Sequence, residues 1–249
     1  MALFGCWYDT AGSESDKERK VLVTAGSIAT VTKWEKFDRA WMKVLNDNEV
    51  TELHMKYFAH GEAQYKPWKQ DKVRRARFLS DLTNVAKRGI NKAFVSALPM
   101  ADYDTVNTEF CLREEIGTPY AVTQALCLAR GLKWLHDRKG GEHNAQFFIE
   151  QGDTGQPEFL KRAHRLLGWA PIPLPRMEQK SGEAYTPFQL ADLIAYEHRL
   201  RYNRHLDASE QELRKSFIAI RRMLPIQVGV MMANGLRDWC RQQGVTRRQ

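Results

Sequence analysis

The 249-residue sequence predicts an α/β fold, in which a mixed β-sheet is flanked by helices and further helices follow toward the C-terminus. Two observations predict this class. Two apolar runs near the N-terminus are typical of a β-hairpin, and strand-like segments then alternate with segments whose apolar residues recur at helical spacing. Because no internal repeat or long linker interrupts the pattern, we expect a single domain over residues 1–249.

The chain opens with two predicted strands. Residues 4–8 are apolar and aromatic and end at Asp9, and residues 20–29 form a second run that is expected to pair with the first. A sheet fixes a carboxylate at a strand end while the adjoining loop leaves it accessible, so Asp9 is a candidate site residue. An Asp in a turn before Thr10 is an equally natural interpretation.

Three elements are predicted next. A capping pattern from Thr32 to Glu35 predicts a helix that buries a tryptophan-rich stripe. Residues 51–59 are expected to form a strand that carries His54, for which a metal or phosphate role competes with that of a hydrogen-bonded structural histidine. Residues 71–88 predict an amphipathic helix with Val73 and Ala76 among its inward residues.

The middle of the chain continues the alternation. Residues 92–98 predict a buried strand, and residues 118–135 predict a helix that is apolar almost all round and therefore belongs in the middle of the fold. Residues 145–149 predict a strand that ends in Glu150, with Asp153 close behind. A helix over 157–167 and a proline-rich connecting loop over 171–185 follow.

The helix that begins at Thr186 and Pro187 carries Asp192 more than one turn inside an apolar run. A carboxylate there is either exposed or buried for a reason, and a buried carboxylate requires a cation, a donor or a metal ion. A capping pattern at residues 209–212 predicts a late helix, and a last helix is expected over residues 231–241.

The net charge of +8 favours polyanionic partners. One basic stretch interleaves cations with aromatic residues, as a groove that follows a phosphate backbone requires. The alternative is the solvated face of a helix. The candidate nucleic-acid-binding residues of this stretch are Lys66, Trp68, Lys69, Lys72, Arg74, Arg75 and Arg77.

Several classes of protein are disfavoured. No apolar run is long enough to span a bilayer and no signal peptide is evident, so we expect a cytoplasmic protein without a membrane partner. The four cysteines are scattered and indicate neither a zinc knuckle nor a disulfide framework. Dinucleotide, phosphate-loop, zinc-protease and serine-hydrolase motifs are missing from the sequence.

Three carboxylates stand out by position: Asp9 and Glu150 at strand ends, and Asp192 within a helix. Two-metal phosphoryl-transfer sites need several hard oxygen ligands that converge on one spot, and carboxylates from two strand ends and one helix can do this. The 30 acidic residues of the chain offer many other triples, however. Lys180 precedes the Asp192 helix and is either a contact for a phosphate or an exposed loop lysine.

Four segments resemble, in family order, the domain of unknown function 3800 family. They are Tyr8-Asp9-Thr10-Ala11-Gly12, Leu53-His54, Phe148-Ile149-Glu150-Gln151-Gly152-Asp153 and residues 188–196. That family is regarded as similar to the ribonuclease H-like superfamily, so the resemblance implies a ribonuclease H-like sheet. It also implies that Asp9, Glu150 and Asp192 bind Mg²⁺ or Mn²⁺, with Asp153 as a further ligand.

The sequence departs from that family in its first motif. The usual pattern is Asp-Glu-Ser-Gly, whereas Thr10 and Ala11 follow Asp9 here. If the missing Glu ligates metal, a member without it binds metal weakly or has lost catalysis.

The leading hypothesis is therefore a Mg²⁺- or Mn²⁺-dependent nuclease that hydrolyses the phosphodiester bonds of RNA or DNA. One alternative is a non-catalytic module that binds nucleic acid or protein on the same fold, and another is a small-molecule phosphoesterase. The sequence leaves the substrate and the oligomeric state open.

Overall fold

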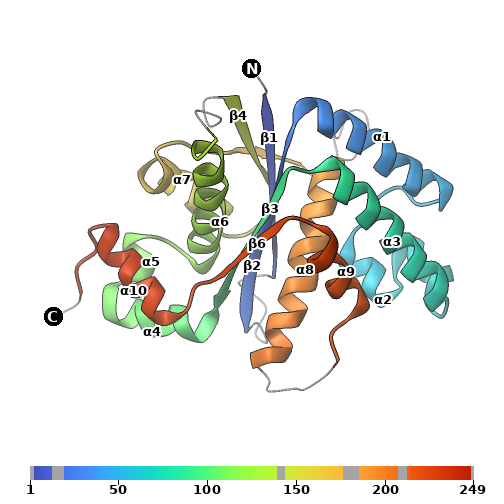
Figure 1. Ribbon diagram of the computed structural model, residues 1–249. Coiled ribbons are helices and arrows are strands. Elements are labelled where there is room, and N and C mark those ends of the chain that lie inside the picture. Colours follow the sequence, from blue (N-terminus) through green and yellow to red (C-terminus); the bar gives the residue numbers. More distant parts are fainter. Residues whose placement is uncertain (1–2, 13–19, 139–143, 176–184, 207–211, 248–249) are drawn as a thin grey trace.

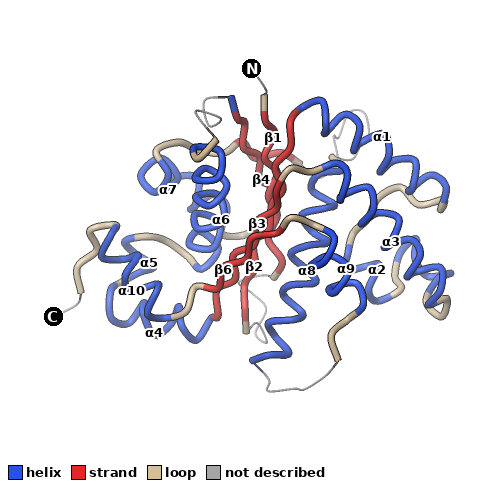
Figure 2. The backbone as a smooth tube through the Cα atoms, viewed as in Figure 1, coloured by secondary structure: helices blue, strands red, loops and turns tan. Residues whose placement is uncertain are grey.

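The computed structural model describes residues 3–12, 20–138, 144–175, 185–206 and 212–247. In these ranges a single six-stranded sheet separates two layers of helices (Figures 1 and 2). The strands are β1 (Phe4–Ala11), β2 (Val21–Thr30), β3 (Lys92–Pro99), β4 (Ala145–Glu150), β5 (Ile172–Leu174) and β6 (Ile226–Val230).

The strand order in the sheet is β5-β4-β1-β2-β3-β6. Strands β1, β2 and β3 form an antiparallel meander, whereas β4 is parallel to β1, β5 is parallel to β4 and β6 is parallel to β3. This meander followed by two parallel strands beside β1 is the arrangement of the ribonuclease H-like fold. The predicted fold class is confirmed, and β6 adds a strand beside β3 that the sequence did not predict.

One layer of helices is built around α8, which packs on β1 and β2, with α1, α2 and α9 against it (Figure 1). Its members are α1 (Val31–Asp47), α2 (Met55–His60), the 3₁₀ helix η1 (Ala63–Trp68), α3 (Lys72–Gly89), α8 (Thr186–Leu206) and α9 (Lys215–Met223). The hydroxyl of Thr186 donates to Asp38 Oδ1 of α1 (2.7 Å) and ties the start of α8 to this layer.

The other layer centres on α6, which packs on β2 and β3 and contacts α7. Its members are α4 (Met100–Phe110), α5 (Leu112–Glu115), α6 (Pro119–His136), α7 (Gln156–Leu167) and α10 (Ala233–Gln242). Every residue of α6 from Pro119 to Leu128 is buried, which confirms that this apolar helix lies in the middle of the fold. Thr118 caps it by accepting the N–H of Ala121 (3.3 Å).

Close packing fixes the register of β1 at the centre of the sheet. Tyr8 lies opposite Gly26 of β2, and its ring covers the Cα of that glycine. The hydroxyl of the same tyrosine reaches the Cα of Gly131 in α6. A side chain at either glycine would overlap Tyr8. The two glycines therefore allow Tyr8 to pack directly on the backbone of β2 and α6, and this packing fixes the position of β1 and of Asp9.

Some local predictions were wrong. Residues 51–59 do not form a strand, because Met55 and Phe58 are buried one helical turn apart and Gly61 ends α2 in the left-handed region (φ 62°). Helix α1 begins at Val31 rather than at Thr32, because the side chain of Thr30 accepts the N–H of Lys33 (3.4 Å) and is the cap.

The inward face of α3 also differs from the prediction. Val73 is 80% exposed and Ala76 is exposed, because Phe78, Leu79 and Leu82 set the buried stripe and leave the first turn outside it. The proline-rich loop contains the short edge strand β5. Helix α9 begins at Lys215, and most of the capping pattern predicted for it lies outside the described residues. No helix in the described part of the chain is long and apolar enough to cross a membrane.

The contact between Gly26 and Tyr8 makes a testable prediction. We expect Gly26→Ala to lower the free energy of unfolding by about 1–3 kcal/mol, because the added methyl group overpacks the Tyr8 ring. Urea unfolding measures the change. Gly235→Ala in α10 is the control, because the added methyl group would contact only the flexible side chain of Met231. The free energy of unfolding of this variant should equal that of the wild type or be slightly higher. Equal stability of the wild type and Gly26→Ala would contradict the packing argument.

Candidate functional site

Asp9 and Glu150 lie beside each other on two neighbouring parallel strands. Glu150 is the last residue of β4, whereas β1 continues past Asp9 to Ala11 and does not end at Asp9 as predicted. Tyr8 of β1 pairs in register with Ile149 of β4, so the next residue of each strand lies beside the other. Side chains alternate along a strand, and Trp7 stacks on Phe148 (4.3 Å) on the face that α8 covers. Asp9 and Glu150 therefore point to this same face, where Asp9 is only 7% exposed.

Thr10 points to the opposite face and is buried against α6. Its Oγ1 lies 2.9 Å from Thr24 Oγ1 and accepts a hydrogen bond from Gln124 Nε2 at 2.9 Å. The backbone N–H of Thr10 donates to Oδ1 of Asp9 (2.7 Å). Residue 10 is thus part of a buried network of uncharged groups and not part of the carboxylate side of the sheet.

Asp153 lies at the same end of the sheet as Asp9. Burial raises the pKa of the Tyr120 hydroxyl well above its ordinary value, and both Asp153 and Asp9 raise it further. The same hydroxyl accepts a hydrogen bond from Gln124 (3.0 Å). Tyr120 therefore stays a neutral phenol beside these carboxylates, and sequence analysis did not identify it as part of the site.

Asp192 faces the start of α2. Its Oδ2 accepts the backbone N–H of Met55 (2.8 Å) and lies 3.4 Å from Nδ1 of His54, so the histidine that the sequence singled out does lie beside Asp192. The side chain of Asp192 is 10% exposed, whereas that of His54 is 31% exposed. The N–H of Met55 is thus a donor of the kind expected for a buried carboxylate, and the partly exposed His54 lies beside it.

Gln189 holds the segment that carries His54. Its Oε1 accepts hydrogen bonds from Nε1 of Trp41 (2.9 Å) and from the backbone N–H of Leu53 (2.7 Å). Gln189 is fully buried and lies three residues before Asp192, so both side chains share one face of α8. Sequence analysis missed it, although a Gln at this spacing inside an apolar run is a signal of a buried hydrogen-bond partner.

The described residues do not assemble a complete metal centre. No group of three or more His, Cys, Asp or Glu side chains among them is placed to hold an ion. Asp192 Oδ2 is directed at the start of α2, and the convergence of Asp9, Glu150 and Asp192 stays a prediction. Asp9 and Glu150 remain a pair of oxygen donors of the kind that Mg²⁺ accepts together with water and substrate phosphate. Lys180 lies outside the described residues.

The basic stretch of residues 66–77 is not a stacking groove. Trp68 is only 3% exposed and packs edge-on against Tyr65 and Phe78, so its ring belongs to the core. Arg74 covers that ring at 4.3 Å, and Arg75 donates to the carbonyls of Phe58 (2.8 Å) and Ala59 (2.9 Å). The prediction that Trp68 stacks on bases was therefore wrong, because its indole ring is buried where η1 packs against α3.

The other cations of this stretch have mixed surroundings. Lys66, Lys69 and Lys72 are exposed, and Arg77 lies 4.0 Å from Asp81. A surface groove between α1 and α3 places Asp47, Asp71 and Asp81 beside Arg74 and Arg77. A region in which both signs of charge alternate has no strong preference for a polyanion.

Comparison with known proteins assigns no family. No family model matches the sequence, and no curated protein matches it. One similar solved structure is that of the complex of PCNA and RNase HII from Archaeoglobus fulgidus, with 13% identity, a TM-score of 0.44 and coverage of 98% of this chain and 92% of that chain. A similarity at this level carries no argument about function.

The role of Gln189 can be tested by substitution. We expect Gln189→Leu to lower the free energy of unfolding by about 2–4 kcal/mol, because the N–H groups of Trp41 and Leu53 lose a buried acceptor. Urea unfolding gives the value. The matched change Gln242→Leu, at an exposed position of α10, should stay within about 0.5 kcal/mol of the wild type. Equal effects of both variants would exclude a special role for Gln189.

Proposed function

We propose that this chain hydrolyses phosphodiester bonds of nucleic acid and belongs with the domain of unknown function 3800 family. One observation carries the proposal: Asp9 of β1 and Glu150 of β4 lie beside each other on adjacent parallel strands and face the layer in which α8 carries Asp192. Ribonuclease H-like nucleases draw their carboxylates from these same elements, a first strand, its parallel neighbour and a late helix.

In this proposal Asp9 and Glu150 hold a divalent ion, Mg²⁺ or Mn²⁺. Two carboxylates side by side repel each other, and a cation between them relieves the repulsion. The ion would supply charge neutralisation at the phosphate and an activated water. Asp153, at the same end of the sheet, is a candidate further ligand.

The remaining groups would bind and orient the substrate. Asp192 fixes the α2 start through Met55 and lies beside the imidazole of His54, which is exposed enough to contact a phosphate oxygen. Tyr120 offers a neutral hydroxyl beside Asp153. Lys180, which precedes α8 in the sequence, is a candidate phosphate contact.

A second candidate function is a non-catalytic module that binds nucleic acid or protein. The observation that favours it is the lack, among the residues whose structure is described, of a cluster of three metal-binding side chains. Such a module would bind without turnover and would not respond to divalent ions.

Cleavage assays separate the two candidates. Labelled single-stranded RNA, single-stranded DNA and an RNA–DNA hybrid are incubated with Mn²⁺ and the wild type, Asp9→Asn or Asp192→Asn. We expect the wild type to cut at least one substrate and both variants to lose at least about 100-fold in rate, because the amides remove the charge but keep the shape. Asp104→Asn, at an exposed position of α4 on the other side of the sheet, is the matched control and should retain full activity. No cleavage by the wild type would support the binding module.

Thermal melting tests the ion separately from turnover. At a Mn²⁺ concentration 100-fold above Kd, the Tm of the wild type should rise by about 5–10 °C. Glu150→Gln should reduce this shift and Asp104→Asn should not. An unchanged Tm of the wild type at millimolar Mn²⁺ would overturn the assignment of the ion site.

A further inference from the structure

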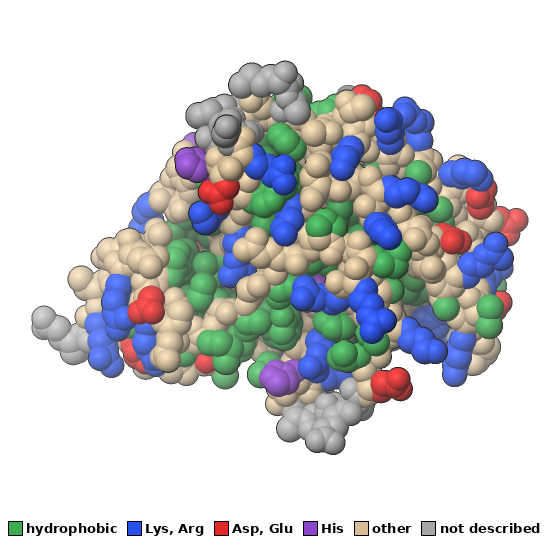
Figure 3. Space-filling view, viewed as in Figure 1, with side chains coloured by type: hydrophobic (Ala, Val, Ile, Leu, Met, Phe, Trp, Pro, Cys, Tyr) green, Lys and Arg blue, Asp and Glu red, His purple; other side chains and the backbone are tan. Residues whose placement is uncertain are grey.

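Six cations are carried by neighbouring parts of the fold, the end of α3, the start of β3 and α9, on a surface that the sequence did not indicate. Figure 3 shows Lys and Arg side chains spread over the centre and right of the face that carries α3 and α9, with acidic side chains mostly toward the right edge. We call this the α3–α9 basic surface, and its members are Lys87, Arg88, Lys92, Lys215, Arg221 and Arg222. All are exposed except Lys92, which is half-buried.

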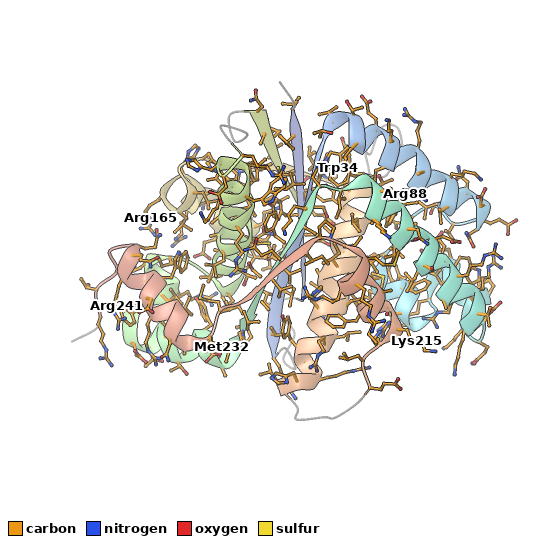
Figure 4. The ribbon with its side chains drawn as sticks, viewed as in Figure 1. Trp34, Arg88, Arg165, Lys215, Met232 and Arg241 are labelled. Carbon is orange, nitrogen blue, oxygen red and sulfur yellow. The ribbon has the colours of Figure 1, made fainter. Side chains whose placement is uncertain are left out.

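Tertiary packing brings these residues together from two distant parts of the chain. Helices α3 and α9 pack against each other, and the backbone N–H of Ala93 donates to the carbonyl of Pro225 (3.1 Å). That bond places Lys92 beside the end of α9, where Arg221 and Arg222 lie. Figure 4 shows Arg88 at the end of α3 and Lys215 at the start of α9.

The surface has little negative charge near it in the sequence. Residues 82–101 and residues 213–237 contain no Asp or Glu. Within the described ranges, none of the six cations forms an ion pair. Arg214 differs, because it pairs with the buried carboxylate of Glu197 (3.0 Å), and it is therefore not counted in the surface. Six like charges repel one another, and a polyanion relieves that repulsion.

Stabilisation of the helices explains only some of these cations. Lys87 and Arg88 lie in the last turn of α3, and Arg221 and Arg222 lie in the last turn of α9, where a positive charge interacts favourably with the helix dipole. Lys215 is the first residue of α9, where the dipole disfavours a cation, and Lys92 begins a strand. A stability role therefore leaves two of the six residues unexplained.

We propose that the α3–α9 basic surface binds the phosphate backbone of a nucleic acid. The inference rests on the proposed function only for the choice of polyanion. The proposal places the contact with the nucleic-acid backbone on this surface and not on residues 66–77. In that stretch Arg74 and Arg75 donate to carbonyl groups of the protein, and acidic side chains lie close by. The surface belongs to the same helix layer as α8.

Binding is measured without cleavage. A fluorescently labelled 30-nucleotide single strand is titrated with protein in EDTA, and anisotropy gives Kd between 50 and 300 mM KCl. We expect Arg221→Gln/Arg222→Gln to weaken binding about 10- to 30-fold at 100 mM salt. The slope of log affinity against log salt should become shallower by about 1.4, because two phosphate contacts are lost. Wild-type affinity and slope in this variant would overturn the proposal.

Two further variants separate binding from stability and from net charge. Lys92→Gln/Lys215→Gln removes cations that the helix dipole does not explain, and it should weaken binding to a similar extent with unchanged urea unfolding. Lys66→Gln/Lys69→Gln removes the same net charge from exposed positions of the predicted stretch and should change Kd by less than about twofold. If this control weakens binding as much as the other variants, net charge alone governs binding and the surface is not a site.

The source of the phosphate groups is tested in parallel. Vesicles with and without 30% phosphatidylserine are mixed with the wild type and with Arg221→Gln/Arg222→Gln. We expect nucleic acid to bind and the vesicles not to bind. Vesicle binding that depends on these arginines, without nucleic-acid binding, would assign the surface to a membrane and overturn the proposal.

Binding and hydrolysis are tested separately, because EDTA prevents metal-dependent cleavage during the binding measurement. A protein that binds nucleic acid through this surface but cleaves none in Mn²⁺ would overturn only the proposed hydrolysis.

Discussion

The parallel pairing of β1 with β4 is the constraint on which the candidate site depends. It sets Asp9 beside Glu150, and the alternation of side chains then separates the two faces of the sheet. Carboxylates face the α8 layer, whereas Thr10, Thr24 and Gln124 form a neutral network on the α6 side. A shift of one residue between the strands would exchange these two environments and would bury charge against α6.

Helix α8 joins the sheet to the helix layer through polar groups set in an apolar helix. Gln189 and Asp192 both receive backbone N–H groups of residues 53–55, so one short segment is held at two points. The hydrogen bonds satisfy groups that would otherwise be costly to bury, and they fix the direction of His54. The role proposed for His54 therefore depends on Gln189, a buried residue to which no substrate contact is assigned.

Much of the architecture could be predicted from the sequence. The hairpin, the apolar helix α6 and the start of α8 have local signals, namely apolar runs and a Thr-Pro pair, and the structure agrees with these elements. The hydroxyl of Thr186 donates to Asp38 of α1, however, which no local pattern indicated. The edge strand β6 was missed because its pairing with β3 spans more than 120 residues and leaves no local pattern. The sequence placed a nucleic-acid groove at residues 66–77 because cations and aromatics alternate there, but alternation along the chain does not show that Trp68 is buried.

The direction of residue 10 changes the meaning of the departure in the first motif. The side chain at this position leaves β1 on the α6 side, with Thr24 as its cross-strand neighbour, whereas Asp9 leaves it on the other. An acidic residue at position 10 would therefore leave β1 toward Thr24 and Gln124, on the face of the sheet opposite to the side chain of Asp9. The hydroxyl of Thr10 instead completes an uncharged hydrogen-bond network with Thr24 and Gln124, and a carboxylate at this position would place a negative charge in that network.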